Sequence, residues 1–329
     1  MKAKIKDTDY LVISARIRSL ERNLLDRARC ERMLEAPNVQ EAARVLTEPG
    51  YREFDVKDSD SLNRALLQRR VDLFAELSGS LPDGRILDVF KLPYDYHNIK
   101  VLIKGGSESL LIDAGRIPAA ELLRRYRDSG KWEFLPQPMA SAAAEGQRVL
   151  AETGDAQRSD ALVDRAYFGE MAKLAEESKC AYLVDYVRAV IDAANLRSVV
   201  RTLRLGRSAV FLREFLFAGG SVSVEACVAA AENGDVEKVY HASALRKAAQ
   251  AGQEAVEAGG SLTEFEKQCD NAVLAQAGRA RRIPFGAEVV IGYVAAREAE
   301  LSAARIIMTG RMAGLSADAI RERLRESYV

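Results

Sequence analysis

The chain has 329 residues, of which 48% are hydrophobic and 29% are charged, so it is long enough to bury a sizeable core and is typical of a folded globular protein. Basic and acidic residues both number 48, and this neutral balance argues against a nucleic-acid-binding protein, whose affinity comes from an excess of basic groups. The four cysteines form no CxxC pair, and with only two histidines in the chain we predict no metal site.

Apolar residues recur at steps of three and four along most of the chain, a spacing that predicts helices. The first such stripe consists of Tyr10, Ile13, Ile17, Leu20 and Leu24. Similar stripes run through residues 183–194 and 293–307, whereas the strict alternation typical of strands is scarce. We therefore predict an all-α fold.

Proline and glycine mark the breaks between the predicted helices. We predict a turn at Pro49-Gly50 and a turn or helix start at Pro93. Residues 131–147, which contain the sole tryptophan and two prolines, are predicted to connect two parts of the fold. The amino-terminal residues lack the apolar core of a signal peptide, and no stretch approaches the roughly 18 apolar residues of a membrane span. We expect a cytoplasmic protein.

A repeated pattern divides the chain further. DYHNIKVLIKG, from Asp95, and DAANLRSVVRTLRLG, from Asp192, share an Asp, then an Asn three residues later, an aliphatic residue, a basic residue and an apolar helical tail. REAELSAARIIMTG, from Arg297, is a weaker third copy in which Glu300 stands at the Asn position. Each copy is followed by an Ala-Gly turn and a short amphipathic helix, so we predict three similar helical units, either in line or around a pseudo-threefold axis.

The segment LPYDYHNIKVLIKG, residues 92–105, is the only catalytic candidate in the chain. On a helix, however, Asp95 and His97 point roughly 200° apart, so an acid–base pair would need a partner from elsewhere. The second copy has Ala194 at the position of His97. Nucleotide-binding and hydrolase motifs such as GxxxxGK[ST], GxGxxG, HExxH and GxSxG do not occur, and we predict no catalytic residue and no cofactor.

What recurs is a set of structural positions, which we expect to form helix-packing hydrogen bonds to neighbouring backbone. These positions are Asp95, Asn98, Asp192, Asn195 and Glu300. Two alternatives stay open: a small cytosolic hydrolase that uses Asp95 and His97, and an unrelated helical scaffold protein.

Four segments together carry a resemblance to a known family. The segments are PYDYHNIKVLIKG, the amino-terminal YLVISARIRSLERNLLD with the following MLEAPNVQEAARVLTEPGY, the central DAANLRSVVRTLRLG, and the carboxy-terminal PFGAEVVIGYVAAREAELSAARIIMTGRMAGLSADAIRERLRESY. They resemble the C subunit of V-type and A-type ATPases (ATP synthases). The members of this family are relatives of the d subunit of the eukaryotic V-type ATPase. The resemblance covers nearly the whole chain.

The resemblance implies a funnel of three pseudo-threefold related helical domains, which we place at residues 1–130, 131–225 and 226–329, with the amino-terminal helix able to pack against the third. It also implies a non-catalytic central-stalk subunit of the rotor. Such a subunit is a socket that couples the shaft subunits D and F to the membrane proteolipid ring, so that torque passes between ATP hydrolysis or synthesis and the transport of hydrogen or other ions. Binding of nucleic acid is not expected, and contact with the membrane, at its cytoplasmic face, is indirect through the ring.

Overall fold

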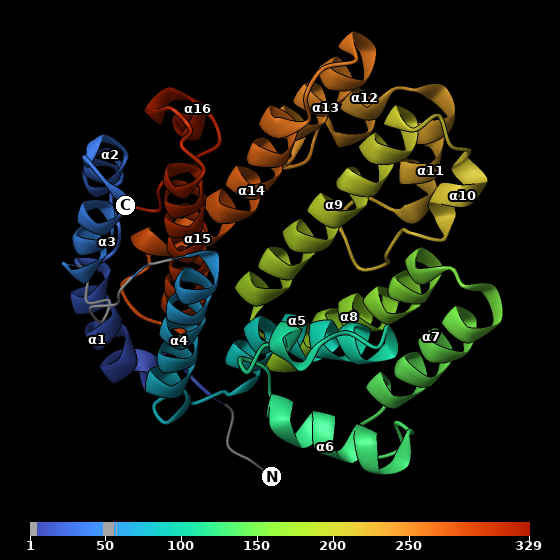
Figure 1. Ribbon diagram of the computed structural model, residues 1–329, viewed down its shortest axis with the longest axis horizontal. Helices are drawn as coiled ribbons and strands as arrows, with labels where there is room; N and C mark the ends of the chain where they lie inside the picture. The colour runs from blue at the N-terminus through green and yellow to red at the C-terminus, as the bar shows by residue number, and fades with distance from the viewer. Residues whose placement is uncertain (1–4, 49–55, 57) are drawn as a thin grey trace. The chain divides into compact units, whose positions relative to one another are not determined.

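The computed structural model in Figure 1 describes residues 5–48, 56 and 58–329. These residues form helices joined by turns and loops, and within the described ranges no segment is a strand, so the predicted all-α fold is confirmed. The turn predicted at Pro49-Gly50 lies outside the described residues.

Two compact units make up the chain. Unit 1 comprises Met1–Asp83 and Ala244–Val329, and unit 2 comprises Gly84–Ser243. The predicted division into three domains stays a prediction.

The helices of unit 1 come from both ends of the chain. They are the 3-10 helix η1 (Asp7–Tyr10), α1 (Leu11–Glu21), α2 (Arg27–Glu35), α3 (Val39–Thr47), α4 (Ser59–Ser78), α13 (Arg246–Ala258), α14 (Thr263–Gly278), the 3-10 helix η3 (Arg279–Arg282), α15 (Ala287–Met312) and α16 (Ala317–Arg321).

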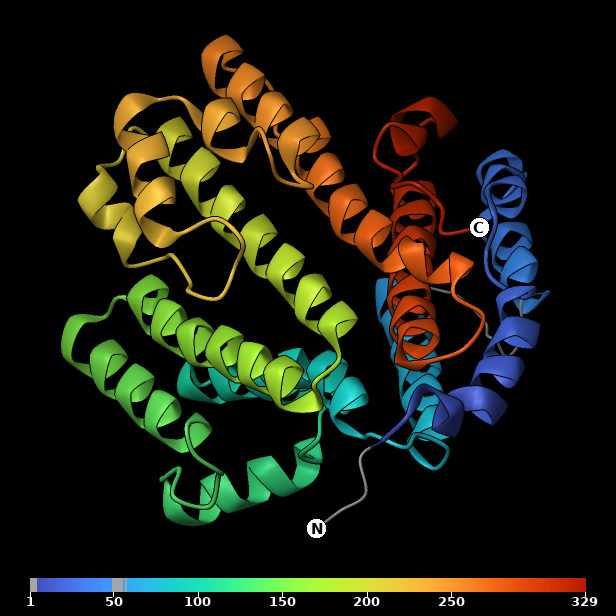
Figure 2. The same ribbon diagram turned by 180° about the vertical axis from the view of Figure 1, so that it is seen from behind.

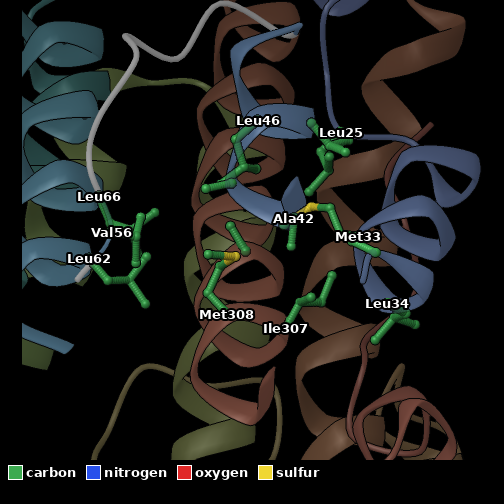
Figure 3. Packing of buried hydrophobic residues seen from close by; sticks show 14 of the residues in the cluster. Leu25, Met33, Leu34, Ala42, Leu46, Val56, Leu62, Leu66, Ile307 and Met308 are labelled. Carbon is green, nitrogen blue, oxygen red and sulfur yellow. The ribbon is translucent and has the colours of Figure 1, made fainter. Parts of the chain in front are cut away.

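The helix α15 is the centre of unit 1, because it contacts α1, α2, α3, α4 and α14. Figures 1 and 2 show it running alongside α4 and α14. In Figure 3, Ile307 and Met308 of α15 pack among buried side chains of the amino-terminal segment, including Met33, Leu46 and Leu62. Burial of such side chains stabilises a fold by about 1.5–3 kcal/mol each, so α2, α3 and α4 share one core with α15 and α16.

The amino-terminal helix follows its predicted stripe for most of its length. Tyr10, Ile13 and Ile17 are buried, but α1 ends at Glu21, so Leu24 lies in the following loop. The guanidinium of Arg18 donates to the carbonyl oxygen of Ala280 over 2.8 Å, which fastens α1 to η3.

Unit 2 contains the first and second copies of the repeat. Its helices are α5 (Arg85–Ile103), the 3-10 helix η2 (Glu108–Leu110), α6 (Ala119–Ser129), α7 (Met139–Thr153), α8 (Ala156–Ser178), α9 (Ala181–Arg204), α10 (Ala209–Arg213), α11 (Val224–Asn233) and α12 (Val236–Tyr240). The helix α8 packs against α5, α7 and α9, and α9 packs against α11. Lys100 of α5 forms an ion pair with Asp164 of α8 over 2.6 Å.

Two expectations about breaks in unit 2 are wrong. Pro93 lies inside α5, and the predicted connector is helical from Met139 onward because an alanine-rich run favours α7. Trp132, before this helix, is buried, stacks on Tyr126 and donates its indole N–H to Gln147.

Short polar side chains set the starts of several helices. Asn38, Asp58, Asp155, Ser223 and Ser316 each accept a hydrogen bond from the backbone N–H three residues further on. Such caps satisfy one of the free N–H groups at a helix start. The third copy of the repeat is therefore followed by a turn and a capped short helix, α16, as its sequence predicts.

Candidate functional site: the clamps of the repeated helices

Asn98 of α5 holds the loop that follows its own helix. Its Oδ1 accepts the backbone N–H of Ile112 over 2.8 Å, and its Nδ2 donates to the carbonyl oxygen of the same residue over 2.8 Å. The side chain is fully buried. A buried amide that pairs with both backbone groups of one residue fixes that residue against the helix.

Asp95, one turn before Asn98, holds the next part of the loop. Its Oδ1 accepts the backbone N–H groups of Arg116 and Ile117 over 2.9 and 3.0 Å, and its Oδ2 accepts the Nε–H of Arg116 over 2.8 Å. Burial raises the pKa of the Asp95 carboxyl, and the bonds from Arg116 and Ile117 oppose this rise. Arg116 also forms an ion pair with Glu170 over 2.9 Å. We call Asp95, Asn98 and loop residues 112–117 the first clamp.

The second copy repeats this geometry on α9. Asn195 accepts the backbone N–H of Phe217 and donates to its carbonyl oxygen, each over 2.8 Å. The carboxylate of Asp192 accepts the backbone N–H groups of Ser221 and Val222 over 3.1 and 3.0 Å. Burial raises the pKa of Asp192, and these backbone bonds oppose the rise. Asp192, Asn195 and loop residues 217–222 form the second clamp.

A glycine in each loop permits the loop backbone to approach the carboxylate closely. A Cβ atom at Gly115 would lie 2.1 Å from Oδ1 of Asp95, and one at Gly220 would lie 2.2 Å from Oδ1 of Asp192. Real Cβ atoms do not come this near to another heavy atom, so any larger residue would displace the carboxylate from its backbone donors. The Ala114-Gly115 turn of the first copy thus has a packing reason, whereas in the second copy the close glycine is Gly220, one residue after the Ala218-Gly219 turn.

The third copy departs from this pattern in both residues and partner. Glu300 of α15 accepts the backbone N–H of Leu25 over 2.6 Å with Oε2, and the guanidinium of Arg297 over 2.7 Å with Oε1. Leu25 belongs to the loop before α2, not to the loop after α15. Glu300 and Leu25 form the third clamp, in which the amino-terminal segment supplies the loop.

The charge of this third clamp is balanced inside the core. Arg297 and Glu300 are 2% and 5% exposed, and Arg297 also donates Nε–H to the hydroxyl of Tyr293 over 2.9 Å. Burial by itself would lower the pKa of Arg297, but Glu300 and Tyr293 together outweigh this effect and the pKa is raised. The arginine therefore stays charged.

His97 and Asp95 engage separate partners. The Nε2 atom of His97 lies 3.0 Å from the carbonyl oxygen of Leu110, while the Asp95 carboxylate is engaged by Arg116 and Ile117. In the part of the chain that the structure describes, no group of three or more His, Cys, Asp or Glu residues is placed to hold a metal ion. Nor does any described helix combine the length and apolar character needed to cross a membrane.

Comparison with known proteins decides the family. The profile of the ATP synthase (C/AC39) subunit family matches residues 13–323. The chain belongs to this family. Its match includes all five clamp side chains of the repeat, on α5, α9 and α15.

Individual relatives from the family are similar over nearly their whole length. The C subunit of the A-type ATP synthase of Methanocaldococcus jannaschii is 25% identical, over 96% of this chain and 86% of its own. The C subunit of the V-type sodium ATPase of Enterococcus hirae is 23% identical, over 97% of this chain and 99% of its own. The C subunit of the V-type ATP synthase of Thermus thermophilus is 24% identical, over 95% of this chain and 98% of its own.

The family predicted from the four sequence segments is thus confirmed. Its relationship to the eukaryotic d subunit stays a prediction, and so does the structural role of the clamp side chains.

Replacing Asn195 by Ala should destabilise unit 2 by about 2–4 kcal/mol, because the buried N–H and carbonyl groups of Phe217 both lose their partner. Chemical denaturation followed by circular dichroism measures the loss. The matched control is Asn233→Ala, which removes an exposed asparagine of the same unit. Equal stability of the two variants would contradict a clamp.

Replacing Gly115 by Ala should lower the free energy of unfolding by about 1–3 kcal/mol, the usual cost of overpacking. The added methyl group would push the Asp95 carboxylate off the backbone N–H groups of Arg116 and Ile117. Gly169→Ala, in α8, is the control, since a Cβ there meets open space and alanine favours a helix. The expected order of melting temperatures is Gly169→Ala above wild type above Gly115→Ala, and a Gly115→Ala protein as stable as wild type would refute the close-approach argument.

The stability contributed by Asp192 should fall as the pH rises. Its pKa is higher in the folded chain than the roughly 3.9 of an unfolded chain, so the folded state binds the proton more tightly. The difference in unfolding free energy between wild type and Asp192→Asn should therefore decrease from about pH 3.9 to the raised folded pKa and then level off. Urea titrations at a series of pH values measure this difference. A difference that grows with pH would show that the backbone bonds outweigh burial.

Proposed function

We propose that this chain is a non-catalytic central-stalk subunit of a rotary V-type or A-type ATPase. In this role it is a socket that couples the shaft subunits D and F to the membrane proteolipid ring, at the cytoplasmic face of the membrane. The observation that carries the proposal is the match of the family profile over residues 13–323. The similarity spans at least 86% of the length of these three relatives, each of which is a C subunit, and this supports the role of a whole subunit for the chain.

The mechanical demand on such a socket follows from the energy it passes on. Moving one charge across about 100 mV is worth roughly 2.3 kcal/mol, so a catalytic step fed by several ions sends on the order of 10 kcal/mol through the rotor. Nanomolar binding corresponds to about 12 kcal/mol. A socket that neither slips nor detaches therefore needs extensive contacts with both partners.

The clamps support this mechanical role. In unit 2, the loops after α5 and α9 are each fastened to their helix at two points by hydrogen bonds to buried side chains. Buried and fully paired polar contacts stiffen a structure, because breaking one leaves an unsatisfied group in the core. Loops held in this way transmit force between helices without first unfolding.

The turn that follows α9 is the contact that we assign to a partner protein. Leu205, in this turn, and Val210, at the start of α10, are 69% and 80% exposed, and Leu110, in the corresponding loop after α5, is 55% exposed. Apolar side chains of this size gain free energy when a partner covers them. We propose that residues 205–210 form part of the attachment to the proteolipid ring.

The two alternative functions make different predictions. A hydrolase that uses Asp95 and His97 would lose its activity on replacement of His97 by Ala, while the rotor protein would keep its coupling. A helical scaffold unrelated to membranes would be recovered without ATPase subunits. The hydrogen bond of His97 to the carbonyl of Leu110 favours a packing role for this residue over an acid–base role.

Affinity purification of a tagged chain from intact cells tests the proposal. We expect it to recover subunits D and F and the proteolipid ring. The double variant Leu205→Ser, Val210→Ser should recover at least about tenfold less ring while keeping D and F, because two apolar contacts are lost. Lys173→Ser, at an exposed site of α8 in the same unit, is the matched control.

Three results would count against these assignments. A chain recovered only as a free species contradicts the rotor function. Recovery of D, F and ring in equal amounts with the double variant contradicts the assignment of residues 205–210 alone. If the double variant keeps its circular dichroism spectrum but loses D, F and the ring together, residues 205–210 contact the shaft as well as the ring, and their assignment to the ring is overturned.

A further inference from the structure

Residues 321–329 join α2 to α14 within unit 1. Arg321 of α16 forms an ion pair with Glu31 of α2 over 2.8 Å, and Arg325 forms one with Asp270 of α14 over 2.8 Å. Both helices also pack against α15. The carboxy-terminal segment is thus a second connection between α2 and α14, in addition to α15.

Beyond α16 this segment has no regular structure. The described residues 324–329 form neither a helix nor a turn (Figure 1), so contacts of individual groups hold them in place. The backbone N–H of Glu326 donates to Oδ1 of Asn271 over 2.9 Å, and the carbonyl oxygen of Tyr328 accepts a hydrogen bond from Arg281 over 2.7 Å. We call residues 324–329 the latch. Segments held by few contacts open locally at a lower cost than the core of a protein.

Tyr328 is the apolar anchor of the latch. It is 6% exposed, whereas the residues on either side of it are exposed. The guanidinium of Arg281 lies 5.7 Å from the centroid of its ring. A Cβ atom at Gly292 of α15 would lie 2.8 Å from its hydroxyl oxygen, so the side chain fills a notch that a glycine leaves open. The attachment of the latch therefore depends on the burial of this one aromatic side chain.

The latch borders a hollow. A cavity of about 580 Å³ is lined by residues of the latch, by Cys30 of α2, by Asn271 of α14 and by Ala299 of α15. Side chains that face such a space lack the dispersion contacts that they would make with closely packed atoms. The cavity side of the latch therefore contributes little to holding it in place.

The charged anchor of the latch is open to water. The side chains of Arg325 and Asp270 are 25% and 44% exposed. An ion pair with this exposure is weak, and salt screens it further. The burial of Tyr328 does not rely on charge attraction in this way. Rising ionic strength therefore favours detachment of the latch, while Tyr328 favours its attachment.

We propose that residues 324–329 are a salt-sensitive latch that detaches from α14 and η3 as one segment while unit 1 stays folded. Detachment removes one wall of the cavity and opens it to solvent. The ion pair of Arg321 with Glu31 keeps α16 on α2 in both states, and Glu300 keeps its bond to Leu25. The latch does not depend on the proposed rotor function.

Alkylation of Cys30 by N-ethylmaleimide in the full-length chain measures the opening, because this thiol lines the cavity. Burial, with smaller contributions from nearby carboxylates, raises the pKa of Cys30 to about 12, so the closed state reacts slowly. Cys180 of unit 2, which is also partly buried, is the internal reference. Peptide mass spectrometry reads both labelling rates from one sample.

Tyr328→Ala should raise the labelling rate of Cys30 at least about tenfold, because the latch loses its buried anchor. Arg325→Gln should raise it about two- to fivefold, the range expected for the loss of one exposed ion pair. Arg323→Gln is the matched control, since this arginine bonds to the carbonyl oxygen of Ala319 and not to α14, and it should leave the rate unchanged.

Salt tests the latch without any substitution. Raising sodium chloride from about 0.05 M to about 1 M should speed the labelling of Cys30 in wild type about two- to fivefold, because the Debye length falls to about 3 Å. Arg325→Gln should show a smaller increase with salt. The labelling rate of Cys180 should stay the same in each comparison.

Hydrogen exchange separates detachment from unfolding. The carboxy-terminal peptide should exchange faster than peptides of α15, and Tyr328→Ala should accelerate the carboxy-terminal peptide while α15 stays protected. The proposal is overturned if the carboxy-terminal peptide exchanges only together with α15, since the segment then opens only when unit 1 unfolds. It is also overturned if Tyr328→Ala with a protected α15 labels Cys30 at the wild-type rate, or if salt leaves the labelling of Cys30 in wild type unchanged.

Discussion

Backbone groups that lie inside the protein need hydrogen-bond partners, and in the loops after α5 and α9 a helix side chain is that partner. Asn98 and Asn195 each pair with both the N–H and the carbonyl of one loop residue, and the neighbouring aspartates pair with the next N–H groups. An aliphatic residue at any of these positions would leave buried groups unsatisfied. The packing of each loop against its helix therefore rests on an acid and an amide three residues apart.

The third copy meets the same need with different chemistry. Its central helix, α15, offers Glu300 to the backbone of Leu25, and a buried arginine neutralises the added charge. This contact unites the two ends of the chain within unit 1, whose hydrophobic core also draws on both (Figure 3). The exchange of an amide for an ion pair is tolerated because Arg297 satisfies the second carboxylate oxygen.

The clamps relate the fold to the proposed function. A helix withstands load through its own backbone hydrogen bonds, but a loop without such bonds needs external support. In unit 2 this support comes from inside the core, which leaves the outer surface of the turn at residues 205–210 open to apolar contacts.

Sequence alone determined the all-α class, the family, and the repeated Asp and Asn positions, because helical periodicity and local residue spacing are written along the chain. It also determined that His97 is not part of what recurs. Only the tertiary structure decided which backbone groups these side chains hold. The partner of Glu300 could not be predicted because Leu25 is distant in sequence. This contact depends on how segments from opposite ends of the chain pack together, which local spacing does not encode.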